Sequence, residues 1–185
     1  MSDIGHNNGP AMDAGFAFRK HAWTKARAQL IPTLPIEILR NRVTRAKELG
    51  LPYKTYASVR ASTGRDVVGF LFSNNALRVF RANAEIPKLR ADKLAKVVAA
   101  KTGLAHAPLT LDHLNLTANG QAPHFNAAWS DIRRLVQAPL HQSKLPFDGV
   151  LVVGDTTLER EWSDAGRLAG YLTAEQFFSA DLTTS

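Results

Sequence analysis

The sequence contains no cysteine, and this absence removes a whole class of chemistry. Disulfide bonds, zinc sites with cysteine ligands and cysteine nucleophiles are all excluded. No apolar stretch approaches the ~18 residues that a membrane-spanning helix requires. The polar start, MSDIGHNNGP, also lacks the apolar core of a secretory signal. From these absences we expect a cytoplasmic protein.

The sequence signatures of several enzyme classes are missing as well. There is no Gly-x-Ser-x-Gly nucleophile elbow, no phosphate-binding P-loop and no dinucleotide-binding glycine fingerprint. The irregular segment 104–124 holds potential metal ligands, but no pair has the close spacing of a metal site: His106, Asp112, His113 and His124. We therefore expect no metal and no cofactor, and these absences favour a protein without enzymatic activity over an enzyme.

Positive charge is concentrated in the first third of the chain. The 185 residues carry 23 Lys+Arg and 16 Asp+Glu, a net charge of +7. Residues 1–65 hold 11 basic and 4 acidic side chains, which leaves +7, whereas residues 66–185 hold 12 of each. A segregated basic segment favours nucleic acid as the partner, because neutralising phosphates releases counterions. The alternative is a solvated basic face, or one that meets an acidic protein.

The basic segment contains the residue pattern of a helix-turn-helix. From Arg42 to Arg60 the sequence reads RVTRAKELGLPYKTYASVR. Counted from Arg42, a small residue stands at position 5, a glycine at position 9, and apolar residues at positions 8, 10, 15 and 18: Ala46, Gly50, Leu49, Leu51, Tyr56 and Val59. The small residue lets two helices cross closely, the glycine takes the turn conformation, and the apolar residues fill the space between the helices.

This stretch resembles the DNA-binding helix-turn-helix of bacterial and phage regulators, although Pro52 stands where a capping Ser or Thr is usual. The resemblance implies that the second helix enters the major groove. Its base-contacting residues would be Tyr53, Lys54, Thr55 and Ser58, and its phosphate-contacting residues Arg42, Arg45, Arg60 and Arg65. For Tyr56 we favour packing. An ordinary helical hairpin closed by Leu49 and Gly50 is the alternative.

Hydrophobic periodicity divides the chain into three parts. Residues 1–13 are predicted to be a disordered tail, and residues 14–65 a basic three-helix bundle with helices over 14–31, 35–49 and from 52 onward. Residues 66–185 are predicted to be a small mixed sheet with flanking helices. Its predicted strands are 67–72 and 150–153, and its predicted helices are 88–101, 125–137, 156–172 and a short one from 173. The predicted fold class is α+β or α/β.

Pattern and charge together predict a nucleic-acid-binding, regulatory protein of a bacterium or prophage. Duplex DNA is favoured over RNA, and a homodimer is expected by analogy. One alternative is a protein interaction module of a phage or mobile element. Another is a small α/β hydrolase that uses C-terminal carboxylates such as Asp148 and Asp155. These two flank opposite ends of a predicted strand, so they would not share a metal, and Asp155 could simply stabilise a helix N-terminus.

Overall fold

The computed structural model describes residues 34–179. Of these, residues 40–179 belong to one compact unit. The predicted tail and the predicted helix 14–31 lie outside the described residues, so the three-helix bundle is not confirmed. The helices are α2 (Ile36–Glu48), α3 (Tyr53–Thr63), α4 (Asn74–Leu77), α5 (Lys88–Lys96), α6 (Trp129–Gln142), α7 (Thr157–Gly166) and α8 (Ala174–Phe178). Among residues 34–179, no helix has the length and apolar character needed to cross a lipid bilayer.

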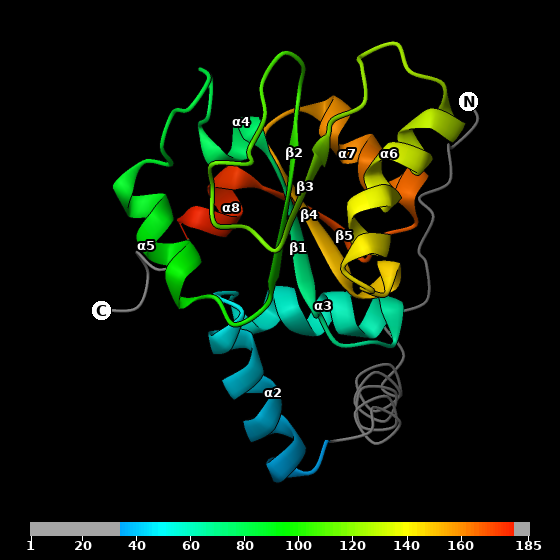
Figure 1. Cartoon of the computed structure of the whole chain (residues 1–185). Coiled ribbons are helices and arrows are strands. Elements are labelled where there is room, and N and C mark those ends of the chain that lie inside the picture. The colour runs from blue at the N-terminus through cyan, green and yellow to red at the C-terminus, as the bar shows by residue number, and fades with distance from the viewer. Residues whose placement is uncertain (1–33, 180–185) are drawn as a thin grey trace, which may run out of the picture. The chain divides into compact units, whose positions relative to one another are not determined.

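Five strands form one sheet in the order β3-β2-β1-β4-β5. They are β1 (Gly69–Ser73), β2 (Ala100–Ala105), β3 (Ala118–Gln121), β4 (Val150–Gly154) and β5 (Gly170–Thr173). All four pairings are parallel, so the expectation of a sheet of mixed direction is wrong. The chain winds from β1 outward to β3 and then returns past β1 to β4 and β5 (Figure 1). This doubly wound arrangement confirms the α/β class.

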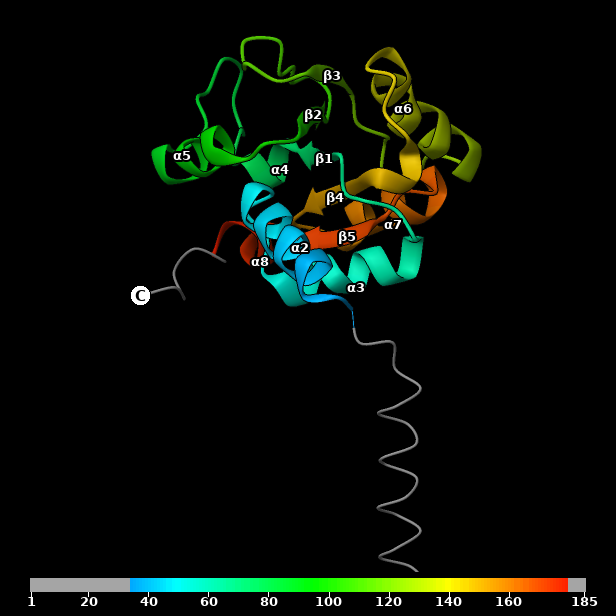
Figure 2. The same ribbon diagram turned by 90° about the horizontal axis from the view of Figure 1, so that it is seen from below.

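The central strand β1 divides the core into two layers. All five of its residues are buried, as a parallel strand covered on both faces requires. Phe72 packs against Phe177 of α8, with ring centroids 5.4 Å apart, whereas Leu71 belongs to the cluster formed with α6 and α7. Figure 2, seen from the amino ends of the strands, shows the sheet between α5 and α8 on one side and α6 and α7 on the other.

A tight turn joins α2 to α3. Gly50 has a φ of 63°, in the left-handed region that favours glycine. Ala46, Leu49, Leu51 and Tyr56 are buried in the core, and Val59 packs against it. The burial predicted for this pattern is therefore present, and it is the burial that any tightly packed helical hairpin needs.

Three strands differ from the sequence-based expectation. The helix predicted over 88–101 ends at Lys96, and β2 follows where the sequence AKTGLA has few strand-forming residues. Edge strand β3 has the polar sequence ANGQ, inside the segment expected to be irregular. The helix predicted over 156–172 ends at Gly166, and β5 follows. These strands form because neighbouring strands offer them hydrogen-bonding partners, which local sequence does not encode.

Helix α6 also begins and ends later than predicted. It starts at Trp129 instead of residue 125, and it continues to Gln142 with Pro139 inside. A proline within a helix removes one hydrogen bond, yet Pro139 and Leu140 are buried here. Tertiary packing therefore extends the helix past a residue that local sequence treats as a stop.

A buried carboxylate closes the junction between β4 and α7. The predicted capping box of Thr156 and Glu159 is present. Glu159 is fully buried, and its Oε2 accepts the backbone N–H groups of Asp155 at 2.5 Å and Thr156 at 3.0 Å. Its Oε1 accepts a hydrogen bond from the side-chain amide of Asn75 at 2.8 Å. One side chain thus ties the carboxyl end of β4 to that of β1.

Replacing this carboxylate should destabilise the whole unit. We expect Glu159→Ala to lower the free energy of unfolding by about 2–4 kcal/mol, because three donors lose their acceptor in the protein interior. Glu161→Ala, an exposed residue of the same helix, should change it by no more than about 0.5 kcal/mol. Urea denaturation measures both. Equal effects of the two substitutions would contradict the role given to Glu159.

Candidate functional site

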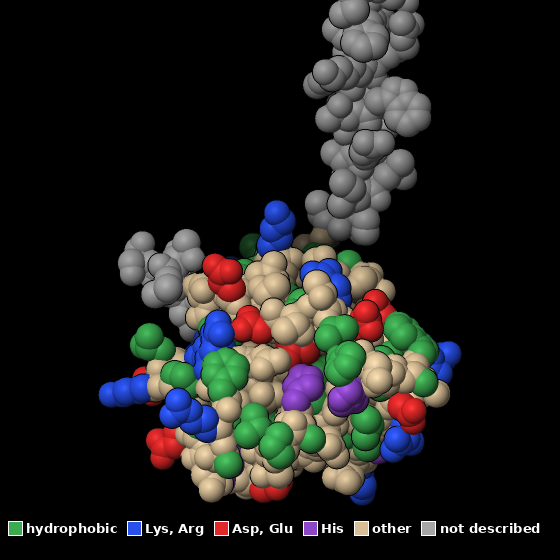
Figure 3. All heavy atoms as spheres, turned by 90° about the horizontal axis from the view of Figure 1, so that it is seen from above, with side chains coloured by type: hydrophobic (Ala, Val, Ile, Leu, Met, Phe, Trp, Pro, Cys, Tyr) green, Lys and Arg blue, Asp and Glu red, His purple; other side chains and the backbone are tan. Residues whose placement is uncertain are grey.

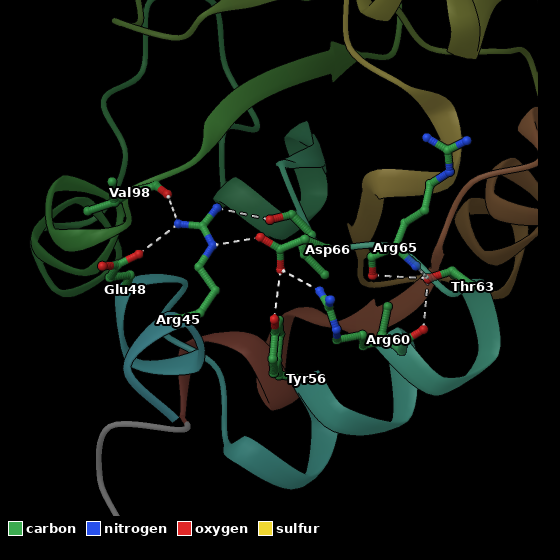
Figure 4. A network of polar contacts seen from close by, with 10 residues as sticks. Arg45, Glu48, Tyr56, Arg60, Thr63, Arg65, Asp66 and Val98 are labelled. Carbon is green, nitrogen blue, oxygen red and sulfur yellow. Dashed lines mark hydrogen bonds and ion pairs between the residues drawn. The ribbon is translucent and has the colours of Figure 1, made fainter. Parts of the chain in front are cut away.

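Asp66 organises the amino end of the sheet, where α3 leads into β1 (Figure 4). Its Oδ2 accepts a hydrogen bond from Arg45 Nε at 3.0 Å. Its Oδ1 accepts one from the Tyr56 hydroxyl at 2.8 Å, and Arg60 Nη1 lies 3.8 Å from the same oxygen. The packing role favoured for Tyr56 is confirmed, since the residue is 2% exposed. One carboxylate therefore holds residues from both helices of the hairpin.

Arg45 donates its hydrogen bonds to the protein itself. Besides Asp66 it contacts Glu48 at 2.8 Å, the carbonyl oxygen of Val67 at 3.1 Å and that of Val98 at 3.2 Å. Burial by itself lowers the pKa of Arg45, but the hydrogen bonds to Glu48 and Asp66 outweigh it and raise that pKa. The guanidinium group thus fastens α2 to the segments that precede β1 and β2. A phosphate contact by Arg45 would compete with all of these acceptors.

The other three arginines that are predicted to contact phosphate differ in how strongly the rest of the protein binds their side chains. Arg60 makes the longer of the contacts with Asp66. Arg65 pairs with Asp148 at 2.5 Å, and both side chains are about half exposed. The Nε of Arg42 is buried and has no hydrogen-bond partner among the described residues. Arg65 is therefore the one of these three that a phosphate could reach at least cost.

The predicted base-contacting residues gather at one surface hollow. Lys54, Thr55 and Ser58 line a cavity of about 590 Å³ beside α3, which we call the α3 hollow. Its remaining lining residues are Leu51, Pro52, Val59, Tyr171, Leu172, Gln176 and Ser179. Tyr53, by contrast, packs against the core and does not line it. The structure thus brings three of the four residues together at a hollow that both apolar and polar side chains line.

A second group of polar residues lies at the carboxyl ends of β1, β2 and β4. We call it the carboxyl-end cluster: Asn74, Asn75, Arg78, His106, Asp155 and Glu159. Figure 3 looks onto this end of the sheet, where acidic side chains and histidines lie near the middle of the face and basic side chains lie beside them. In doubly wound sheets this edge, where the strand order reverses between β1 and β4, is the general ligand-binding position.

Hydrogen bonds connect the cluster across three strands. The Oδ1 of Asn74 lies 2.9 Å from His106 Nδ1 and accepts the backbone N–H of His106 at 3.1 Å. The centroid of the His106 ring lies 5.7 Å from the ring centroid of buried Trp162 on α7. Arg78 and Asp155 form an ion pair at 3.3 Å. Asn74 is itself buried, so these contacts are part of the fold.

Sequence reasoning found only part of this cluster. It identifies Asp155 as a strand-to-helix residue, but it places His106 in an irregular segment and gives Asn74 and Asn75 no binding role. Two asparagines directly after one apolar strand, with an aspartate directly after another, are the signal that could have joined them. As expected, Asp148 and Asp155 lie at opposite ends of β4.

Among residues 34–179, no three His, Cys, Asp or Glu side chains lie together so as to hold a metal ion. Comparisons of the chain with models of protein families, with curated proteins and with solved structures find no match.

The role of Asp66 can be measured by stability. We expect Asp66→Asn to lower the free energy of unfolding by about 1–2 kcal/mol, because it removes the charge that Arg45, Arg60 and Tyr56 share. Asp148→Asn is the matched control. It breaks an ion pair between exposed groups and should cost no more than about 0.5 kcal/mol. A larger loss in the control would show that the hairpin is held elsewhere.

The Tyr56–Asp66 hydrogen bond also predicts a pH dependence. Burial and the bond to Asp66 raise the pKa of Tyr56 above its ordinary value of 10.0. The folded state therefore binds this proton more tightly, so the stabilisation is fully present below about pH 10 and is lost as the pH rises through the folded pKa. Tyr56→Phe should reduce the loss of stability that the wild type shows as the pH rises above about 10. Tyr53→Phe, which removes a phenol that does not contact Asp66, should leave that loss unchanged.

Proposed function

We propose that this chain is a nucleic-acid-binding protein that contacts the phosphate backbone, most readily of duplex DNA, with the α3 surface. By this name we mean the α3 hollow together with the exposed side chains of α3 and Arg65. The observation that carries this proposal is the gathering of Lys54, Thr55 and Ser58 on one open hollow of a helix in the basic segment. An ammonium group and two hydroxyls are donors of the kind that hold phosphate oxygens. A regulatory role in a bacterium or prophage stays a prediction from the resemblance.

The exposed side of α3 suits close approach of a nucleic-acid strand. Beyond Lys54 and Ser58, the exposed positions are Ala61 and Ser62, whose side chains are small, and then Arg65. Steps of three and four residues place Lys54, Ser58, Ala61 and Ser62 on one face of α3, and Arg65 follows the end of the helix. Cations at both ends of a stripe of small residues can contact successive phosphates without steric obstruction.

The charges available for this contact are fewer than the sequence suggests. Arg45 and Arg60 share Asp66, so in this proposal they position the hairpin. Arg65 can exchange its surface carboxylate for a phosphate at small cost, since exposed ion pairs contribute little. Together with exposed Lys54 and Lys47, Arg65 supplies the electrostatic attraction.

The same surface could meet an acidic protein, and salt dependence separates the two functions. We expect the full chain to bind non-specific duplex DNA with an affinity that falls steeply as salt rises. Lys54→Ala should weaken binding about three- to tenfold and reduce the slope of log affinity against log salt by about 1. A fluorescence anisotropy titration at several salt concentrations, with duplex DNA and with single-stranded RNA, gives both quantities.

The matched control is Arg134→Ala, an exposed cation of α6 outside the α3 surface. It changes the net charge by the same amount and should leave the slope unaltered. If both substitutions weaken binding equally, attraction to net charge explains the result and the α3 surface is not the interface. Absence of salt-dependent binding to either polymer would refute the proposed function and favour the protein-interaction alternative.

A further inference from the structure

The carboxyl ends of β1 and β4 are joined by two polar bridges, one buried and one exposed. The inner bridge is the hydrogen bond from Asn75 to Glu159, whose oxygens also accept the backbone N–H groups of Asp155 and Thr156. These donors are the ones that an anion at this junction would otherwise use. The chain's own carboxylate occupies that place, so a ligand is excluded from the inner layer.

The outer bridge is the ion pair of Arg78 with Asp155, and it is open to solvent. The two side chains are 46% and 26% exposed. Exposed ion pairs of this kind contribute little to stability, because water solvates both partners when they separate. A soluble anion can therefore replace Asp155 on Arg78 without disturbing the buried bridge beneath it.

A second guanidinium group lies beside this pair. Arg90 of α5 donates a hydrogen bond to the carbonyl oxygen of Ala76, and its guanidinium lies 4.6 Å from the ring centre of Phe178. Burial, and then the positive charge of Arg78, lower the pKa of Arg90, while Asp155 opposes this. Within residues 34–179, Asp155 is the one carboxylate that interacts with either arginine, so two positive charges share one negative charge.

Arg78 also has a backbone conformation that residues other than glycine rarely adopt. It has a φ of 59°, in the left-handed region where a Cβ costs energy and glycine is favoured. From this position its N–H ends α4 on the carbonyl oxygens of Asn74 and Asn75. Glycine would perform that backbone function with less strain. Substituting Arg78 by glycine therefore removes the side chain without straining the turn.

We propose that Arg78 and Arg90 form an anion site for a phosphate group at the junction of β1 and β4, with Asp155 as the internal competitor that the ligand displaces. Paired guanidinium groups bind phosphate through parallel N–H donors, which suits this ligand class. The site does not rest on the proposed function, since its residues lie at the opposite end of the strands from Asp66 and outside α2 and α3 (Figure 1).

The ion pair permits a test in which its two partners give opposite results. Isothermal titration calorimetry of the full chain would use inorganic phosphate and a nucleoside monophosphate as probes. Arg78→Gly should weaken phosphate binding about tenfold or more, because it removes one fork of donors while keeping a residue that suits the positive φ. Asp155→Asn should tighten binding about three- to tenfold, because it removes the competing charge.

Arg167→Gly is the matched control. Arg167 also ends a helix with a positive φ, of 54°, and it is exposed, but it follows α7 at the amino end of β5. The substitution removes one guanidinium from the same kind of backbone position and should leave phosphate binding unchanged. Urea denaturation of each variant verifies that it is folded.

Two further probes distinguish the sources of the phosphate. An oligonucleotide with a 5′-phosphate and the same oligonucleotide with a 5′-hydroxyl are compared, both with wild type and with Arg78→Gly. A phosphate-dependent difference that Arg78→Gly abolishes assigns the site to a nucleic-acid end, whereas binding of the small probes alone assigns it to a free phosphate or nucleotide. The proposal is wrong if no phosphate probe binds, or if Arg78→Gly and Asp155→Asn shift the affinity in the same direction.

Discussion

The rest of the unit depends on the central strand β1, which is hydrogen-bonded on both edges and buried on both faces. A strand in this position can carry no charge along its length, because both faces must be covered by apolar helices. Polar chemistry is therefore confined to the two segments that flank it. Asp66 stands just before the strand, and Ser73, Asn74 and Asn75 stand at its end. The segment after β1 forms part of the carboxyl-end cluster, and Asp66 before β1 holds the hairpin to which α3 belongs.

At each end of β1 a carboxylate stabilises the fold, and this structural role is independent of any ligand. Asp66 collects Arg45, Tyr56 and Arg60 and so locks the basic hairpin to the sheet. Glu159 fills the junction of β1 and β4 with acceptors. Two surfaces that these anchors leave exposed are the α3 hollow, which β5 and α8 also line, and the outer pair of Arg78 and Asp155 at the carboxyl ends of the strands. Formal charge in a sequence overstates the charge that a ligand meets, because arginines in a fold also bind carbonyls and carboxylates.

Sequence reasoning succeeded where a short stretch determines its own structure. The hairpin turn at Gly50, the buried residues around it, the strand at Val150–Val153 and both capping boxes depend on residues within one or two helical turns of each other. It failed where a partner distant in sequence decides. Strand β2 forms because β1 and β3 flank it, and its Gly103 leaves room for Leu111 and Leu116, which lie 2.7 Å from where a Cβ would stand. Strand β5 similarly owes its state to β4.

The same distinction between local sequence and tertiary structure applies to the candidate sites. The sequence by itself determined the segregation of positive charge, the hairpin pattern from Arg42 to Arg60 and the α/β character of residues 66–185, because composition and periodicity are local properties. Only the tertiary structure decided which arginines are engaged internally and which carboxylates hold them. It alone joined Asn74, His106 and Asp155, each of which stands directly after a different strand, at one edge. The physical reason is that parallel strands bring their carboxyl ends together regardless of their separation along the chain.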